Sequence, residues 1–226
     1  MLDRASVGGS GTVPSAMGKR LRGGPVWLGE LGFDGDQQAD RKNHGGPAKA
    51  VLVYPAEHYP FWLGRYGFSF DDRGLGENLR TRGWDETTVH PGDRFRIGEA
   101  LVRVTAPRRP CYKLGLNQGI KDLAVHVQAT GRTGFYLAVE GPGFVEVGVA
   151  IELVEAAAHG VSAFEVNRVL NIDKFDQSGI ERVLTAADYL PGPWVEKLLG
   201  RRASTRDEPP RGPASLAAED DPRLFG

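Results

Sequence analysis

The chain has 226 residues, with 28 basic and 29 acidic side chains, a formal net charge of −1, one cysteine, 31 glycines and 15 prolines. This balance of charge argues against a surface for nucleic acid or for anionic membranes, and one cysteine cannot form a disulfide within the chain. The sequence has no apolar run near the roughly 20 residues that span a bilayer, and its first residues lack an apolar signal core, so a cytoplasmic protein is expected. The many glycines and prolines favour short strands over long helices.

The first 46 residues are predicted to contain one strand and one unusual loop. The first 14 residues give little pattern, and 25–33 alternate enough to form a strand that enters a turn. A polar, glycine-bounded loop follows at 35–46, and its amides, cations and imidazole suit a phosphate or a polar heterocycle. A plain solvated loop explains the same composition. His44 has no second His or Cys at ligand spacing, so zinc is not expected.

The middle of the chain is predicted to be rich in strands. Residues 49–54 form a strand, and 57–63 begin a short helix or turn whose aromatic side chains are first expected in the core. Segment 75–79 is tight and places Glu77 beside Asn78. Alternation over 89–98 and 100–105 predicts a hairpin closed at Gly98-Glu99.

The stretch from Pro107 to Leu114 holds the only cysteine, Cys111. Pro107 and Pro110 bracket two arginines and favour an extended, stiff loop. Three cations, Arg108, Arg109 and Lys113, lie within three residues of the sulfur. Nearby positive charge favours the thiolate, which is both a nucleophile and a metal ligand. The alternative is a buried cysteine with a structural role only.

The last part of the chain changes from strands to helices. A helical turn is predicted at 123–129, a hairpin pair at 133–139 and 144–149 around Gly141-Pro142-Gly143, and a strand at 151–154. Closely spaced short strands of this kind are typical of a barrel. Ser162 and Glu165 have capping-box spacing at the start of a helix at 162–170, and two more helices are expected at 178–190 and 193–199. The predicted organisation is a barrel domain at 1–157, a three-helix domain at 158–200 and a disordered tail at 201–226.

Several of these segments, taken together and in order, resemble one known family. They resemble the MOSC domain, named after the C-terminal part of molybdenum-cofactor sulfurase, and within that family the YiiM-like bacterial proteins. The stretches that carry the resemblance are Ser15-Ala16-Met17-Gly18-Lys19-Arg20, Gly35-Asp36-Gln37-Gln38-Ala39-Asp40, His44-Gly45-Gly46, Glu57-His58-Tyr59, Gly76-Glu77-Asn78-Leu79 and Pro107-Arg108-Arg109-Pro110-Cys111-Tyr112-Lys113-Leu114.

The resemblance implies a mainly β fold, a MOSC-type β-barrel with peripheral short helices and a small C-terminal three-helix module. It also implies that molybdenum cofactor is bound, with the thiolate of Cys111 as the protein ligand to the metal. Basic and polar loop residues would hold the pterin and phosphate, and the positions that match are Lys19, Asp36, Gln38, Asp40, His44, Gly45, Asn78, Arg108 and Lys113. At family level, the resemblance also implies binding of pyridoxal phosphate.

Two functions follow from this resemblance. The first is a reductase of small N-hydroxylated compounds, such as hydroxylaminopurine-type bases and amidoximes, with His44 or Asp36 as candidate proton donors. Since the sequence holds no flavin or nicotinamide motif, a separate reductase would have to supply the electrons. The second is a carrier of molybdenum cofactor or a sulfur-transfer module without turnover, and a barrel without any cofactor is a third, plainer reading. The substrate is expected to be a free small molecule, and a homodimer is compatible with the sequence.

Overall fold

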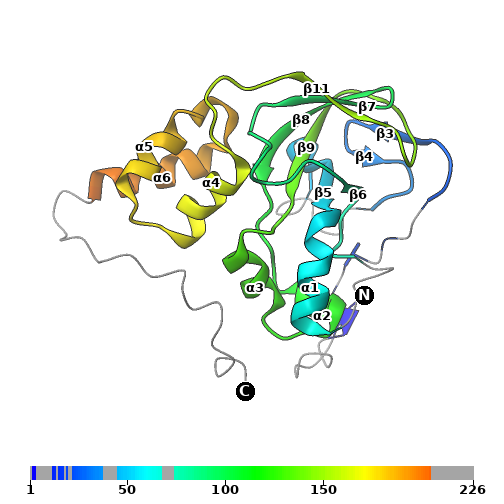
Figure 1. Ribbon diagram of the computed structural model, residues 1–226, viewed down its shortest axis with the longest axis horizontal. Helices are drawn as coiled ribbons and strands as arrows, with labels where there is room; N and C mark the ends of the chain where they lie inside the picture. The colour runs from blue at the N-terminus through cyan, green and yellow to red at the C-terminus, as the bar shows by residue number, and fades with distance from the viewer. Residues whose placement is uncertain are drawn as a thin grey trace.

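The computed structural model describes residues 2–3, 12–13, 15–17, 19, 22–37, 45–67 and 74–204. Figure 1 shows a strand-rich body with a group of helices, α4 to α6, beside it. Within the described ranges, no helix is both long and apolar enough to cross a membrane.

A six-stranded sheet forms the body. Its order is β11-β7-β8-β9-β5-β6, and every neighbouring pair is antiparallel except β5 and β6, which are parallel. The bounds are β5 (Val51–Pro55), β6 (Leu79–Thr81), β7 (Arg94–Ile97), β8 (Ala100–Pro107), β9 (Phe135–Gly141) and β11 (Ile151–Glu155). Every residue of β5 is buried, as expected for a central strand covered on both faces.

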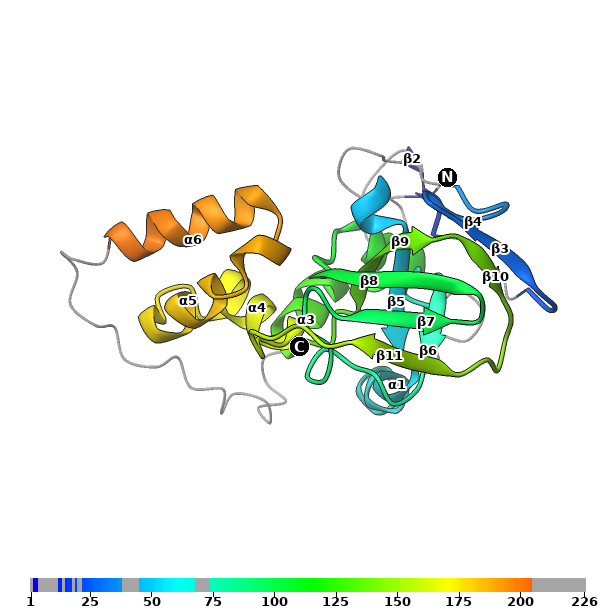
Figure 2. The same ribbon diagram turned by 90° about the horizontal axis from the view of Figure 1, so that it is seen from above.

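A three-stranded sheet, β10-β3-β4, lies against one side of the larger sheet (Figure 2). Its strands are β3 (Val26–Gly29), β4 (Gly32–Phe33) and β10 (Gly143–Val145), and a further pair is formed by β1 (Leu2–Asp3) and β2 (Thr12–Val13). The large sheet curls, so the mainly β, barrel-like expectation is confirmed as a curled mixed sheet with short helices around it.

One predicted hairpin is confirmed and another is wrong. β7 and β8 pair around Gly98-Glu99 as expected. The segment Gly141-Pro142-Gly143 does not close a hairpin, because β9 already has β8 on one edge and β5 on the other. The chain instead leaves the large sheet, and β10 pairs with β3.

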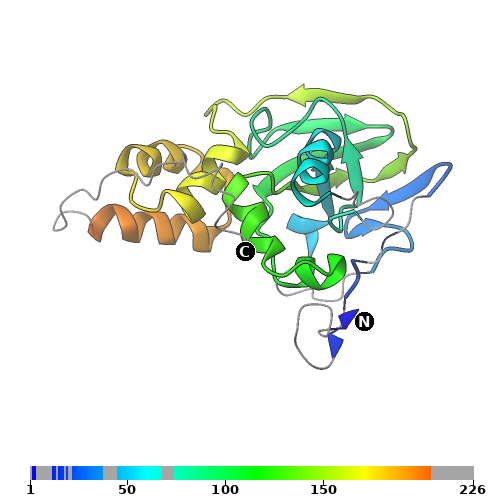
Figure 3. The same ribbon diagram turned by 60° about the horizontal axis from the view of Figure 1, so that its bottom comes forward.

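Short helices cover the body on the side of β5. They are α1 (Tyr59–Tyr66), α2 (Lys113–Gln118) and α3 (Leu123–Thr130), with 3-10 turns η2 (Pro47–Lys49) and η3 (Ala56–His58). An apolar cluster packs between these helices and β5, and its buried members are Tyr54, Trp62, Leu75, Leu114, Leu123 and Val127. In Figure 3, where this face comes forward, the N-terminal strands lie next to α2.

The C-terminal helices form a module with its own apolar core. They are α4 (Ala163–Asn167), which continues into the π-helical turn η4 (Arg168–Ile172), α5 (Gln177–Leu184), the 3-10 turn η5 (Ala187–Tyr189) and α6 (Gly192–Ser204). Ser162 caps α4 by accepting a hydrogen bond from the backbone N of Glu165 at 3.2 Å, as the capping-box spacing predicts. Helix α6 continues past the predicted boundary at residue 200 to Ser204, and the rest of the predicted tail lies outside the described residues.

Candidate functional site

A cavity of about 100 Å³ opens where β8 ends and the Cys111 loop begins. It gathers residues from six separate stretches of the chain. Its described lining consists of Ser15, Ala16, Met17, Lys19, Asp36, Gln37, Lys49, Ala50, Leu52, Gly76, Asn78, Arg108, Arg109, Cys111, Lys113 and Tyr136.

The cavity therefore brings together six of the ten positions that the resemblance assigns to the cofactor and its metal, namely Lys19, Asp36, Asn78, Arg108, Cys111 and Lys113. Gly45 is half-buried and is not part of this lining. Gln38, Asp40 and His44 lie outside the described residues. Their roles stay predictions.

The Cys111 loop is anchored at both ends by backbone hydrogen bonds. At its start, the backbone N of Arg108 donates to the carbonyl of Gly134 at 2.8 Å. At its end, the backbone N of Leu114 donates to the carbonyl of Cys111 at 2.9 Å, as α2 begins. Cys111 itself is half-buried and lines the cavity, so its thiol is accessible from that side.

Arg108 is the most unusual side chain of the site. It is 5% exposed, it lines the cavity, and its NH1 nitrogen has no hydrogen-bond partner in the part of the chain that the structure describes. A buried guanidinium nitrogen without a partner carries an uncompensated desolvation cost, which an anionic ligand in the cavity would offset. The site is therefore suited to an anionic occupant.

Asp36 connects two other residues of the cavity lining, Lys19 and Asn78. Its Oδ2 accepts hydrogen bonds from Lys19 Nζ and from Asn78 Nδ2, both at 2.6 Å. Asn78 is fixed in turn to β5, since its Oδ1 accepts from the backbone N of Leu52 at 2.9 Å. Burial lowers the pKa of Lys19, although the hydrogen bond and charge of Asp36 act to raise it.

Tyr136 and Lys49 belong to the site and were not expected from the sequence. Tyr136 lies opposite Ala106 in the β8–β9 ladder, so the register places it beside the start of the Cys111 loop. Burial raises its pKa, the charge of Arg108 lowers it, and Cys111 raises it, which places all three groups in one neighbourhood. Lys49 lies over the Tyr136 ring, with Nζ 5.7 Å from the ring centroid. In the sequence Tyr136 was one aromatic of a strand, and only the pairing of β9 with β8 distinguishes it.

The charge of the lining is strongly uneven. Five cations, Lys19, Lys49, Arg108, Arg109 and Lys113, face the cavity against one carboxylate, Asp36, among the described residues. The whole chain has a formal net charge of −1, so the positive charge is local. Focused positive charge of this kind attracts anionic ligands.

Comparison with known proteins supports the same family as the motifs. The family model described as "MOSC domain" matches residues 40–152. The chain is 44% identical over 169 residues to "Uncharacterized protein YflK" of Bacillus subtilis, covering 75% of this chain and 76% of that protein. It is 39% identical over 198 residues to "Protein YiiM" of Escherichia coli, covering 86% of this chain and 88% of that protein.

The chain belongs to the MOSC domain family. The crystal structure of YiiM from Geobacillus stearothermophilus matches this MOSC fold with a TM-score of 0.71 at 30% identity, over 83% of this chain and 89% of that one. A fungal protein of Gibberella moniliformis named "Reductase" is 32% identical over 164 residues, which cover 71% of this chain but 29% of that longer protein. By family, the MOSC domain is one that binds molybdenum cofactor. None of these matches supports the expected binding of pyridoxal phosphate.

Proposed function

We propose that this MOSC protein binds molybdenum cofactor in the Cys111 cavity and reduces small N-hydroxylated compounds. The observation that carries the proposal is the buried Arg108, whose NH1 lacks a partner among the described residues and which shares the cavity with the only cysteine of the chain. The similarity to a protein named "Reductase" supports an oxidoreductase over a purely structural barrel.

The donor set of the cavity fits this cofactor. Cys111 supplies a soft thiolate, the ligand type that a molybdenum–sulfur centre prefers. Arg108 and Lys113 would hold the anionic phosphate, and Asp36 and Asn78 offer polar atoms to the pterin. When bound, the cofactor supplies a metal centre that exchanges two electrons.

The proposed reaction breaks the N–O bond of the substrate and forms an N–H bond and water. It consumes two electrons and two protons, so a compound R₂N–OH becomes R₂N–H. The electrons come from a separate reductase. Lys19 is the described residue that best supplies a proton, because burial lowers its pKa and makes its ammonium a better acid than a solvated lysine. Asp36, a candidate proton donor in the sequence, accepts two hydrogen bonds on one oxygen and is better suited to hold Lys19.

The test uses protein expressed in a host that makes molybdenum cofactor. We expect metal analysis to find molybdenum, and we expect reduced viologen to drive conversion of 6-hydroxylaminopurine to adenine. Cys111→Ala should lose the molybdenum–thiolate signal in X-ray absorption and lose activity. Tyr112→Ala is the matched control, because Tyr112 is the next residue, is 57% exposed and does not line the cavity.

Two outcomes would contradict parts of this proposal. Wild-type protein without molybdenum would remove the cofactor assignment. Protein that holds molybdenum through Cys111 but reduces none of several N-hydroxylated substrates would instead support a cofactor carrier or sulfur-transfer module.

A further inference from the structure

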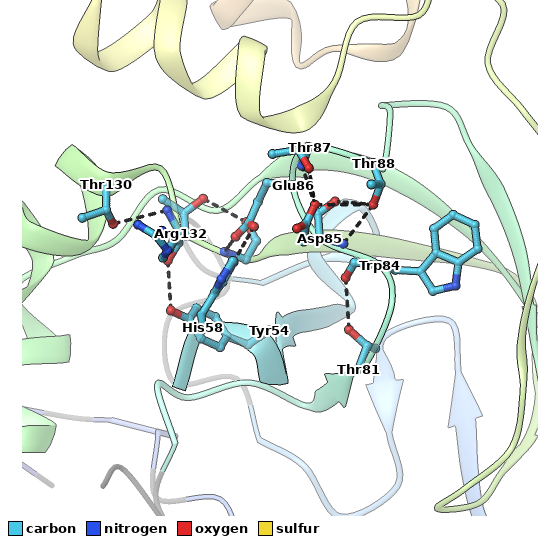
Figure 4. Close-up of polar contacts among 12 residues, drawn as sticks. Tyr54, His58, Thr81, Trp84, Asp85, Glu86, Thr87, Thr88, Thr130 and Arg132 are labelled. Atoms are coloured by element: carbon cyan, nitrogen blue, oxygen red, sulfur yellow. Dashed lines mark hydrogen bonds and ion pairs between the residues drawn. The ribbon is translucent and has the colours of Figure 1, made fainter. Parts of the chain in front are cut away.

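The core of the body contains a carboxylate–histidine pair outside the cavity lining. Glu86 is 1% exposed and His58 is 8% exposed, and Glu86 Oε2 lies 2.6 Å from His58 Nε2. Figure 4 shows the two side chains pointing toward each other near Tyr54 and Arg132. The family motif at 57–59 includes His58, but the proposed chemistry makes no use of it.

Local sequence explains why Glu86 points inward. Asp85 accepts hydrogen bonds on Oδ1 from the backbone N of Thr87 at 2.9 Å and from its hydroxyl at 2.6 Å, an Asx-type turn visible in Figure 4. The backbone of Glu86 is fixed as well, because its carbonyl accepts from the backbone N of Phe164 at 2.7 Å. The backbone that carries the Glu86 carboxylate is thus fixed by the turn and by the contact with Phe164.

The second carboxylate oxygen of Glu86 connects the pair to the cavity. Glu86 Oε1 accepts a hydrogen bond from the backbone N of Gly134. The carbonyl of Gly134 accepts in turn from the backbone N of Arg108 at 2.8 Å. Gly134 has a φ of +77°, and a Cβ at this position would collide with the carbonyl oxygen of Val53, so the backbone here requires glycine and packs closely on β5.

We infer that Glu86, supported by His58, is a positioning residue that holds Arg108 against the cavity through the backbone N–H and carbonyl of Gly134. The path has three steps: His58 fixes Glu86, Glu86 fixes the Gly134 N–H, and the Gly134 carbonyl fixes the Arg108 N–H. The inference rests on the proposed function only for the assignment of Arg108 as the residue that meets an anionic ligand.

A matched pair elsewhere in the fold separates positioning from general stability. Asp93 is also 1% exposed and accepts from a histidine, with Oδ2 3.0 Å from His90 Nδ1. Its Oδ1 accepts from the backbone N of Ala157 at 2.8 Å, and neither Asp93 nor His90 lines the cavity. Substituting Asp93 therefore removes a buried carboxylate that contacts a half-buried histidine, without touching the path to Arg108.

The single thiol gives a readout that needs no cofactor. In cofactor-free protein, the rate constant for alkylation of Cys111 by iodoacetate, an anion, is divided by that for iodoacetamide, a neutral reagent. The ratio reports the positive potential at the thiol, because the two reagents differ in charge and little in size. Arg108→Gln should lower the ratio roughly three- to tenfold, the size expected for loss of one nearby unit charge.

We expect Glu86→Ala to lower the ratio in the same direction as Arg108→Gln, and Glu86→Gln to restore it, because the amide oxygen of Gln can still accept from Gly134 N. Combined with Arg108→Gln, Glu86→Ala should cause no further change. Asp93→Ala should reduce stability but leave the ratio at its wild-type value. If Glu86→Ala does not fold, His58→Leu, which leaves the carboxylate in place with one anchor missing, should lower the ratio by a smaller factor.

An unchanged ratio in folded Glu86→Ala or His58→Leu protein would overturn the inference, as would an equal fall in Asp93→Ala or no effect of Arg108→Gln. Since the assay contains neither molybdenum nor an N-hydroxylated substrate, its result is independent of whether the proposed reaction occurs.

Discussion

Among the described residues of the cavity, Asp36 is the carboxylate that meets the cations. Lys19 is held at 2.6 Å from Asp36 in a mostly buried position, with side-chain exposures of 22% and 19%. Burial lowers the pKa of Lys19 below its usual 10.5, and Asp36 opposes that change. Lys19 therefore binds its proton more tightly in the unfolded chain than in the folded protein. Its contribution to stability is fully present above pH 10.5 and is lost as the pH falls through the folded pKa.

The lowered pKa of Lys19 and the opposing charge of Asp36 predict how the variant Asp36→Asn behaves. The substitution removes the charge that keeps Lys19 protonated, so the pKa of Lys19 should fall further. At pH 7 the free energy of unfolding should drop by about 1–2 kcal/mol, the range for hydrogen bonds to charged groups. The difference from wild type should shrink as the pH rises toward the usual lysine pKa of 10.5, because Lys19 loses its proton below that value. Urea unfolding at several pH values measures this.

Asp34→Asn is the control for this experiment, because Asp34 is exposed and lies two residues away in the same segment. An equal loss of stability in both variants, or a loss that does not change with pH, would contradict the role assigned to the Lys19–Asp36 pair.

At the scale of residues, sequence reasoning identified several of the side chains that line the cavity but not their arrangement. The cations around Cys111 were evident because they are neighbours in the chain, and Lys19, Asp36 and Asn78 matched family motifs. Tyr136 and Lys49 were missed because only the β8–β9 ladder and η2 bring them to the cavity. The partnerless NH1 of Arg108 is likewise a property of packing, which no spacing in the sequence encodes.

At the scale of elements, the start of α5 depends on one side chain. Asp176 is the N-cap, and its Oδ1 accepts from the backbone N of Gly179 at 2.9 Å. The other carboxylate oxygen of Asp176, Oδ2, lies 2.7 Å from Arg168 NH2. The pKa of Asp176 is lowered, first by the Gly179 amide and then by Arg168 and Ser178. A carboxyl with a lowered folded pKa stabilises the fold above its unfolded value near 3.8, and this contribution is lost as the pH falls through the folded pKa.

We therefore expect Asp176→Ala to lower the free energy of unfolding by about 1 kcal/mol at pH 7, the usual cost of losing an N-cap. The difference should become smaller below pH 4. Asp173→Ala is the control, because the Asp173 side chain contacts the other nitrogen of Arg168 at 2.7 Å but does not cap the N-terminus of α5. A larger loss in Asp173→Ala than in Asp176→Ala would show that the ion pair matters more than the cap.

The pairing of the strands shows what periodicity does and does not predict. Alternation located β7, β8 and β9 well, and the β7–β8 hairpin followed from a short turn. The same logic joined β9 to β10 and was wrong, because a strand has only two edges and both edges of β9 were taken by strands distant in sequence. Short-range patterns identify strands, whereas their partners depend on the whole sheet.

At the scale of the whole molecule, the helical module is joined to the body through the first turn of α4. The backbone N of Ala163 donates to the carbonyl of Val89 at 2.9 Å, and Ala163 is part of the apolar core of the body. Gln128 of α3 adds a side-chain bond of 2.6 Å to Asn167. A module with its own apolar core can unfold independently, but these contacts tie its first helix to the sheet.

The last prediction concerns this junction. Phe164 follows Ala163, its backbone N donates to Glu86, and its ring packs on Gly131, where a Cβ would lie 2.5 Å from the ring. We expect body and module to unfold in a single transition, since neither side keeps its packing at the junction without the other. Phe164→Ala should lower the stability of both by about 2 kcal/mol, less than for a fully buried phenylalanine because the ring is only half-buried. Phe175→Ala is the control, because that ring is 67% exposed.

The measurement compares two probes during denaturant unfolding of a Trp194→Phe background. Its remaining tryptophans, Trp27, Trp62 and Trp84, all lie in the body and report on it by fluorescence, whereas far-UV circular dichroism follows the helices, many of which belong to the module. Coincident curves that shift together in Phe164→Ala are expected. Two separate transitions, or a shift of the module alone, would contradict this prediction and would mean that the module unfolds as a tethered domain.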